Sequence, residues 1–321
     1  MKTEIGLDVE KASGFLKEGR PVGVPTETVY GLAGIISNPR GISAIFDAKN
    51  RPNYDPLIIH GYNENYLFEK VCVEVPKEAY ALAKAFWPGP LTLVLKKDSS
   101  ISEKITAGLD TVAIRVPAHP LFRSLLKVVN EGLAAPSANP FGFISPTNAE
   151  HVYDQLQGKI PYILDGGKAK IGLESTIINI TQKPFTILRP GAITAKEISQ
   201  VIGEEVRIAS KEAKIIAPGT LERHYSPLTP TLDISHLKEF LLEKPKSKVG
   251  IVAFSHTLED IPISNQVVLS KTKNLTEAAQ NFYAGLRKLD KLELDVIFID
   301  EIPKKGIGIA LNDRRKRALK T

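Results

Sequence analysis

The sequence is poor in the residues that build disulfide-linked, metal-clustered or membrane proteins. Cys72 is its one cysteine, which excludes an intrachain disulfide and a metal site made of clustered cysteines. No apolar run reaches the roughly 18 residues that cross a bilayer, and the first residues lack the apolar core of a signal peptide. We therefore expect a cytoplasmic protein without membrane contact.

Several catalytic signatures are also missing. The chain has no Walker A sequence, no H-E-x-x-H, no G-x-G-x-x-G and no Ser/His/Asp series in a known order. These absences argue against covalent catalysis and tight zinc chemistry, and we expect no side-chain cluster that holds a metal. The surplus of hydroxyls and cations indicates binding and orientation of a nucleotide instead.

Length predicts the number of domains, and net charge bears on the class of ligand. The chain has 321 residues, which at about 150 residues per domain predicts two domains. Lysine and arginine number 42 against 36 aspartates and glutamates, a net charge of +6. That excess is too small to indicate nucleic-acid binding by itself. A few surplus lysines explain it, and so does a polyanionic small substrate such as a nucleotide.

Short apolar runs alternate with helical patterns along the chain, which is the signature of an α/β fold. Several strands after Tyr162 have no helix between them, so we expect a mixed sheet with α+β character. The predicted strands of the N-terminal part are 21–24, 57–59, 91–95, 112–116, 162–164, 175–180 and 185–188, and its predicted helices are 9–18, 41–49, 77–86, 121–129, 149–157 and 196–201.

The regular pattern stops between residues 204 and 230, where Pro218-Gly219 and His224-Tyr225-Ser226-Pro227 indicate a linker. Beyond it, parallel strands at 249–254, 267–269 and 296–300 and helices at 275–289 and 309–319 predict a small Rossmann-like βαβ domain. We expect a catalytic domain at residues 1–203, a linker and lid at 204–230, and the small α/β domain at 231–321.

Polar residues gather in turns beside the N-terminal strands. The run Pro25-Thr26-Glu27-Thr28-Val29-Tyr30-Gly31-Leu32 follows the strand 21–24. In an expected strand-to-helix turn, its hydroxyls and backbone N–H groups either meet a ligand or simply cap the helix.

Two further runs bring cations. In Lys49-Asn50-Arg51-Pro52, the two cations are expected to leave an extended loop on one side and clamp a polyphosphate, unless the loop is merely solvated. Asp55 and His60 follow shortly after. On the strand 112–116, Arg115 shares a face with Thr111 and Ala113, where a buried guanidinium needs an anion from the protein or from a ligand.

The run Ala134-Ala135-Pro136-Ser137-Ala138-Asn139-Pro140 combines small residues, which admit a ligand close to the backbone, with hydrogen-bonding side chains. After Ser145-Pro146, Thr147 and Glu150 are expected to form a capping box on a helix whose N-terminus suits a phosphate. Glu174-Ser175-Thr176 opens one strand and Arg189-Pro190-Gly191 closes another.

Taken in order, these motifs resemble those of the YrdC-like family. They are P-T-E-T-V-Y-G-L, K-x-R-P, A-I-R-V-P, A-P-S-A-N, S-P-T, E-S-T and R-P-G. The linker P-G-x-x-x-x-H-Y-S-P and the ending I-A-L-N-D-R are similar to the longer, two-domain members. The resemblance implies a twisted mixed sheet with helices around a basic cavity.

Members of that family are threonylcarbamoyl-AMP synthases, so the resemblance implies site residues as well. The L-threonine side would hold Thr28, His60, Arg115, Ala135 and Ser175. The ATP side would hold Arg51, Asp55, Thr111, Ser137, Asn139, Ser145, Arg189 and Tyr225, with Lys49 and Arg51 as catalytic residues. Asp55 departs from the family, which commonly has asparagine there, and a carboxylate near a triphosphate repels it unless Mg²⁺ intervenes.

The implied reaction joins L-threonine, bicarbonate and ATP into threonylcarbamoyl-AMP and pyrophosphate. Mg²⁺ would arrive with ATP, and the product would serve modification of the adenosine beside the anticodon of certain tRNAs. Small-molecule substrates are the expected partners. A downstream threonylcarbamoyl transferase complex would follow, and direct tRNA binding is not required.

Two other functions are compatible with parts of the sequence. One is a carbamoyl transferase of the same fold, although such modules sit in chains with zinc-finger-like domains, and this chain has one cysteine. The other is an RNA-binding protein that uses Arg314-Arg315-Lys316-Arg317 and Lys320. A run of that kind is commonly a solvated helix face, and no RNA-binding motif with interleaved aromatics accompanies it.

Overall fold

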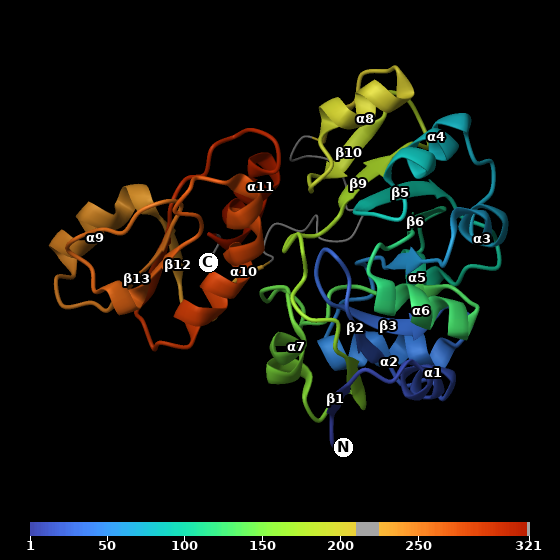
Figure 1. Ribbon diagram of the computed structural model, residues 1–321, viewed down its shortest axis with the longest axis horizontal. Helices are drawn as coiled ribbons and strands as arrows, with labels where there is room; N and C mark the ends of the chain where they lie inside the picture. Colours follow the sequence, from blue (N-terminus) through green and yellow to red (C-terminus); the bar gives the residue numbers. More distant parts are fainter. Residues whose placement is uncertain (210–224, 320–321) are drawn as a thin grey trace. The chain divides into compact units, whose positions relative to one another are not determined.

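A computed structural model describes residues 1–209 and 225–319. The chain forms two compact units (Figure 1). Unit 1 comprises residues 1–141, 146–170 and 174–221, and unit 2 comprises 142–145, 171–173 and 222–321. Most of the predicted linker, including Pro218-Gly219 and His224, lies outside the described residues, and so does Lys320.

Unit 1 is built on an eleven-stranded mixed sheet in the order β1-β8-β2-β3-β7-β4-β6-β5-β9-β10-β11, as expected from strands without intervening helices. The strands are β1 Glu4–Gly6, β2 Val22–Val24, β3 Gly31–Ile35, β4 Ile58–His60, β5 Leu91–Lys96, β6 Thr111–Arg115, β7 Leu133–Ala134, β8 Tyr162–Leu164, β9 Thr176–Asn179, β10 Thr186–Arg189 and β11 Arg207–Ile208.

The helices of unit 1 include all six that were predicted, each with bounds within two residues. They are α1 Val9–Lys17, α2 Pro39–Lys49, α3 Glu64–Lys70, α4 Lys77–Phe86, α5 Glu103–Thr106, α6 Pro120–Val129, α7 Ala149–Leu156 and α8 Ala195–Ile202. The short α3 and α5 were not predicted, because segments of seven and four residues are too short to show a helical period.

Helices cover the two sheet faces differently. The larger core cluster packs residues of α2, α3, α4, α7 and α8 on one face. On the other face, α1 and α6 pack over β2, β3 and β8. Farther along that second face, Ile58, Val94, Ala113, Ile177 and Leu188 form a small apolar cluster made of strand residues alone. Of the expected site residues, His60, Thr111 and Arg115 stand on this second face, on the same strand positions as Ile58 and Ala113.

Two local expectations were wrong. Residues 25–30 do not lead into a helix, because β3 follows and pairs antiparallel with β2, with Val24 opposite Gly31. Thr147 and Glu150 form no capping box, since the side chain of Asn148 is the N-cap of α7 and accepts from the His151 N–H. A capping box does occur at Thr194 and Glu197 of α8.

Unit 2 holds a four-stranded, all-parallel sheet in the order β12-β15-β13-β14, as expected for its βαβ pattern. A cluster of apolar residues from β13, β15 and the loop before β14 forms its core. The elements are β12 Thr231–Asp233, η1 Ile234–His236, α9 Leu237–Glu243, β13 Val249–Ala253, η2 Ile263–Asn265, β14 Gln266–Val268, α10 Leu275–Asp290, β15 Val296–Ile299 and α11 Gly308–Ala318.

Candidate functional site

Arg115, the last residue of β6, joins two motifs that are far apart in the sequence. Its side chain is buried, and its Nη2 lies 2.5 Å from Glu27 Oε1 in an ion pair. Nη1 donates to Thr28 Oγ1 at 3.0 Å, and Nε donates to the Gly89 carbonyl at 3.0 Å. The anion beside Arg115 is therefore a protein carboxylate, and Glu27 fixes the plane of the guanidinium.

Thr26 explains how this turn keeps its shape. Its Oγ1 accepts the N–H groups of Thr28 and Val29 at 3.0 and 3.2 Å. Such a side-chain-to-backbone turn is a local alternative to helix capping. It directs the Thr28 hydroxyl toward Arg115, so the hydroxyl of Thr26 serves the turn rather than a ligand.

His60, at the end of β4, lies directly opposite Arg115 in the parallel ladder. Burial, with the nearby charge of Arg115, lowers the pKa of His60 to about 3. The imidazole is therefore neutral at physiological pH. Its ring lies 5.5 Å from that of Phe122 in α6.

Ser175 connects the E-S-T and R-P-G motifs. Its hydroxyl lies 2.7 Å from Thr92 Oγ1, and Arg189 donates from Nη2 to that hydroxyl and from Nε to the Ser175 carbonyl. Gly191 allows this approach, since a Cβ there would stand 2.3 Å from the Thr176 amide nitrogen. The glycine of R-P-G is thus required by a backbone contact.

Three cations surround one buried carboxylate on the other side of the candidate site. Asp55 is fully buried, and its Oδ2 lies 2.9 Å from Arg51 Nη2. Burial raises the pKa of Asp55, although the charges of Arg51, Lys49 and Arg189 oppose the rise. Burial, together with the charge of Arg51, holds the pKa of Lys49 well below its usual value. A set of basic side chains gathered at one buried carboxyl group suits a polyanion, whose charge would favour the protonated form of Lys49.

Lys49 brings the K-x-R motif to the A-P-S-A-N motif. Its Nζ donates to the backbone carbonyls of Ser137, at 2.5 Å, and Asn139. The expected extended loop was wrong, because Lys49 is the last residue of α2 and Asn50 is its left-handed C-cap. Lys49 and Arg51 nevertheless both lie beside Asp55, one from the helix end and the other after the cap.

The remaining expected residues lie at different places relative to Arg115 and the basic cluster. Ala135 donates its N–H to the Ile58 carbonyl at 3.0 Å, next to the apolar cluster of the sheet face. Thr111 begins β6, four residues or about 13 Å before Arg115 on the same strand face. Ser145 and Tyr225 both belong to unit 2, where Tyr225 is buried with its ring 5.7 Å from that of Tyr283 and 5.2 Å from the Arg314 guanidinium.

Two contributors did not follow from the sequence as site residues. Glu27 stood inside the first motif, but nothing in the sequence paired it with Arg115, 88 residues away. Thr92 lies in a run of apolar strand residues. The available signal was that a single hydroxyl stands in this run, on the same strand face as Val94.

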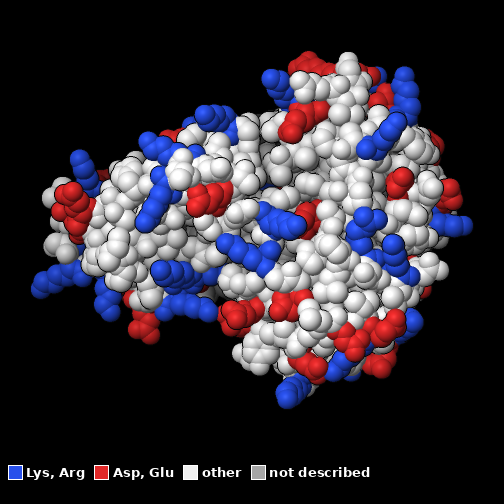
Figure 2. Space-filling model, viewed as in Figure 1, with Lys and Arg blue, Asp and Glu red and all other residues white. Residues whose placement is uncertain are grey.

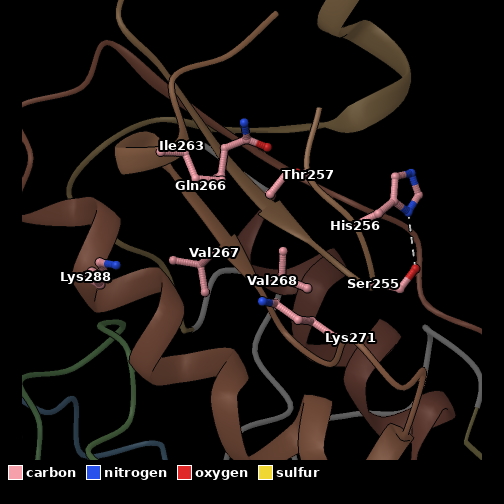
Figure 3. A pocket seen from close by; sticks show the side chains of 9 residues that line it. All are labelled: Ser255, His256, Thr257, Ile263, Gln266, Val267, Val268, Lys271 and Lys288. Atoms are coloured by element: carbon pink, nitrogen blue, oxygen red, sulfur yellow. Dashed lines mark hydrogen bonds between the residues drawn. The ribbon is translucent and has the colours of Figure 1, made fainter. Parts of the chain in front are cut away.

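Unit 2 has a pocket of its own, whose lining differs from the candidate site of unit 1 (Figure 3). Its volume is about 690 Å³, and no residue of the expected site lines it. The cations in the part of its lining that the structure describes are the exposed Lys271 and Lys288. It is lined by Ser255, His256, Thr257, Ile263, Gln266, Val267, Val268, Lys271 and Lys288.

The basic run near the C-terminus does not form a solvated face. Arg314 and Arg315 are buried, and they pair with Asp313 and Asp233. Arg317 also pairs with Asp313, at 3.1 Å. On the face shown in Figure 2, exposed lysines, arginines and acidic residues are interspersed rather than gathered by sign. This weakens the RNA-binding alternative.

Metal-binding clusters and membrane-spanning helices are both absent from the residues that the structure describes. Residues 1–209 and 225–319 contain no group of three or more histidines, cysteines, aspartates or glutamates placed to hold a metal ion. Within the same residues, no helix has both the length and the apolar character needed to cross a membrane.

Two family models together match almost the whole chain. The Sua5/YciO/YrdC model, described as telomere recombination, matches residues 14–191. A second model, described as the C-terminal domain of threonylcarbamoyl-AMP synthase, matches residues 193–319.

Individual relatives agree with the models. The chain is 40% identical to a threonylcarbamoyl-AMP synthase of Pyrococcus abyssi, over 96% of this chain and 92% of the relative. It is 36% identical to that of Bacillus subtilis, over 97% and 92%. The crystal structure of P. abyssi Sua5 complexed with L-threonine matches with a TM-score of 0.90 and 37% identity, over 99% of this chain and 98% of that one.

Proposed function

Because this chain belongs to the Sua5/YrdC family of threonylcarbamoyl-AMP synthases, we propose that it joins L-threonine, bicarbonate and ATP into threonylcarbamoyl-AMP, releasing pyrophosphate. The enzyme serves threonylcarbamoyladenosine modification of tRNA. The observation that carries the site assignment is the cluster of Lys49, Arg51 and Arg189 around Asp55, which concentrates positive charge beside the other motifs.

The L-threonine side is proposed at Arg115 and its neighbours. Of five guanidinium N–H donors, three make the contacts with Glu27, Thr28 and Gly89, which leaves two for the substrate carboxylate. Neutral His60 adds no competing charge there. Thr28 and Ser175 would bind polar groups of threonine, and Ala135 would keep the wall small.

The ATP side is proposed at the three cations, with Ser137, Asn139 and Thr111 beside them. Arg51 and Arg189 offer planar forks that match phosphate oxygens, and Lys49 offers a point charge. A bound triphosphate would favour the charged form of Lys49, whose pKa burial holds low. Ser145 and Tyr225 are assigned to this side on the resemblance alone.

The chemistry we propose is mainly electrostatic. The threonine amine captures the carbon of bicarbonate with loss of water, and the resulting carboxylate oxygen attacks the α-phosphorus of ATP. The bond from the α-phosphorus to the bridging oxygen breaks, and pyrophosphate leaves. Lys49, Arg51 and Arg189 stabilise the charge that develops on the phosphates, and exclusion of water protects the labile anhydride.

Mg²⁺ fits this proposal as a companion of ATP rather than as a resident of the protein. Asp55 is the carboxylate at the cation cluster, but it is fully buried and paired with Arg51. When bound to the triphosphate, the ion would neutralise charge on the leaving group. Asp55 is better suited to hold Arg51 in place than to bind the metal.

Transfer of the adenylate to tRNA would require a separate threonylcarbamoyl transferase. In the described part of the chain, arginines of the C-terminal basic run pair with acidic residues. The proposal therefore includes no direct contact with tRNA.

Pyrophosphate release tests the proposed reaction. ATP and Mg²⁺ are supplied with both L-threonine and bicarbonate, and each is then omitted in turn. We expect release to require both and to yield an adenylate that carries labelled threonine. Release that continues without either would leave an ATP hydrolase and refute the assignment.

A further inference from the structure

Helix α10 of unit 2 holds three separate segments of the chain on one of its faces. The face consists of Ala279, Tyr283, Arg287 and Asp290, spaced by four, four and three residues, which places them along one side of a helix. We call these four residues the anchor face. Apart from Asp290, they are buried.

The first held segment is Gly142–Ser145, which unit 2 includes although it interrupts unit 1 in the sequence. Arg287 Nη2 donates to the Ile144 carbonyl, and both residues are buried. The Ser226 N–H donates to the Gly142 carbonyl at 3.0 Å, which adds a second tie to the same segment.

The second held segment is Ile171–Leu173, also part of unit 2. Gly172 has a φ of +79°, and a Cβ there would lie 2.6 Å from the Ala279 carbonyl oxygen and 2.7 Å from Gln280 Cα. Only glycine allows this segment to approach the helix backbone so closely.

The third held segment is the end of the linker. Asp290 accepts the N–H groups of Leu228 and Thr229 at 3.1 and 2.8 Å, from Oδ2 and Oδ1. The Tyr283 ring packs against that of Tyr225, at 5.7 Å between centroids.

The first two segments lead directly into site motifs. Ile144 immediately precedes Ser145-Pro146-Thr147, and Leu173 immediately precedes Glu174-Ser175-Thr176. We infer that the anchor face of α10 positions these two motif loops, with Arg287 as the positioning residue for the ATP-side loop and Gly172 for the threonine-side loop. The inference deepens the proposed function and rests on it for the substrates concerned.

The kinetic test compares Arg287→Met with wild type. Methionine keeps an apolar stem but removes the donor to the Ile144 carbonyl. We expect KM for ATP to rise about tenfold, the size of effect typical for loss of one charge-assisted hydrogen bond. We expect kcat to change less than about twofold, and KM for threonine likewise. Arg287→Lys, which restores one donor, should recover most of the affinity.

Lys288→Met is the matched control, because Lys288 is the next residue on α10 and is exposed. It should leave both KM values unchanged. An unchanged KM for ATP in Arg287→Met, or an equal rise in the control, would overturn the inference. A loss of affinity with no recovery in Arg287→Lys would also count against it, as a merely structural effect.

The second loop is tested with a pair of glycine variants. Gly172→Ala should raise KM for threonine several-fold, because the new methyl group displaces the loop from Ala279. Gly203→Ala is the control, since Gly203 has a similar φ of +72° but open space around it. Equal effects of the two variants on KM for threonine would contradict the role of Gly172.

Hydrogen exchange separates failure of this inference from failure of the proposed function. Arg287→Met should exchange the amides of residues 142–145 at least tenfold faster than wild type, whatever reaction the enzyme catalyses. Faster exchange in an enzyme without threonine-dependent pyrophosphate release would refute the proposed function but support the role of the anchor face. Unchanged exchange would refute the role of the anchor face.

Discussion

The two units of this protein arrange their basic residues in different ways. In unit 1, the charges of Lys49, Arg51 and Arg189 act on the buried carboxyl group of Asp55. In unit 2, Arg314, Arg315 and Arg317 share the two carboxylates of Asp313 and Asp233. Burying charge is costly unless it is paired. In unit 2 each arginine of the set pairs with Asp313 or Asp233. In unit 1 three basic side chains lie at one buried carboxyl group, an arrangement that suits a polyanionic ligand.

Arg51 is the basic residue whose loss should reduce activity most. Arg51→Ala should reduce pyrophosphate release by at least about 100-fold, because a cation aimed at the transferring phosphate is lost. Lys271→Ala, at the pocket of unit 2, should reduce it less than about twofold. Steady-state pyrophosphate assays of both variants make the measurement.

Loss of Arg51 also leaves Asp55 buried without its closest partner, so the fold must be checked. We expect Arg51→Ala to lose about 3–5 kcal/mol of unfolding free energy. Arg51→Ala combined with Asp55→Asn should recover stability but not activity. Recovery of activity in the double variant would show that Arg51 acts only by neutralising Asp55.

The next effect concerns the threonine side. Arg115→Gln should lower kcat/KM for threonine by about 100-fold, because it removes the guanidinium that binds the substrate carboxylate. Glu27→Gln should lower it by about tenfold, because it leaves the guanidinium in place but removes the carboxylate that orients it. Arg317→Gln, which breaks an ion pair in unit 2, serves as the control. A larger loss in Glu27→Gln than in Arg115→Gln would reverse the roles assigned to the pair.

His60 should make the stability of unit 1 depend on pH. His60 has a pKa of about 3 in the folded protein, against 6.5 when unfolded. The unfolded chain therefore binds more protons between these values, so His60 contributes stability above pH 6.5 that is lost as the pH falls toward 3. The slope is about 1.4 kcal/mol per pH unit. Denaturation of His60→Gln at several pH values should lack this component, and an identical slope would contradict it.

The smallest effect concerns the sheet face beneath Ser175. Thr92→Val keeps the shape of the side chain and removes its hydrogen bond, which should cost about 1 kcal/mol of stability. KM for threonine should rise two- to fivefold. Denaturant titration and initial rates measure the two effects, and Thr186→Val, on β10 and outside the site, is the control. Equal changes in both variants would remove Thr92 from the site.

Much of this architecture could be predicted from the sequence because it depends on local patterns. Every helix longer than seven residues in the described chain was located, since periodicity and caps lie within each segment, but the short strands β1, β7, β11 and β12 were not predicted. The strand β3 was missed, because Gly31–Ile35 follows a polar turn closely and lacks alternation, being buried throughout.

The site was predictable as a set of motifs but not as a geometry. Arg115 clearly needed an anion, yet Glu27 could be identified only once the sheet placed the two motifs together. Likewise Lys49 meets the Ser137 carbonyl from 88 residues away. Long-range pairings of this kind depend on strand order, which no local pattern specifies.

A crystal structure with L-threonine and a non-hydrolysable ATP analogue would show both halves of the proposed site at once. We expect the threonine carboxylate at Arg115 and the triphosphate beside Lys49, Arg51 and Arg189, with the pocket at Lys271 empty. Nucleotide or threonine bound in that pocket of unit 2, with the sheet face of unit 1 unoccupied, would contradict this assignment.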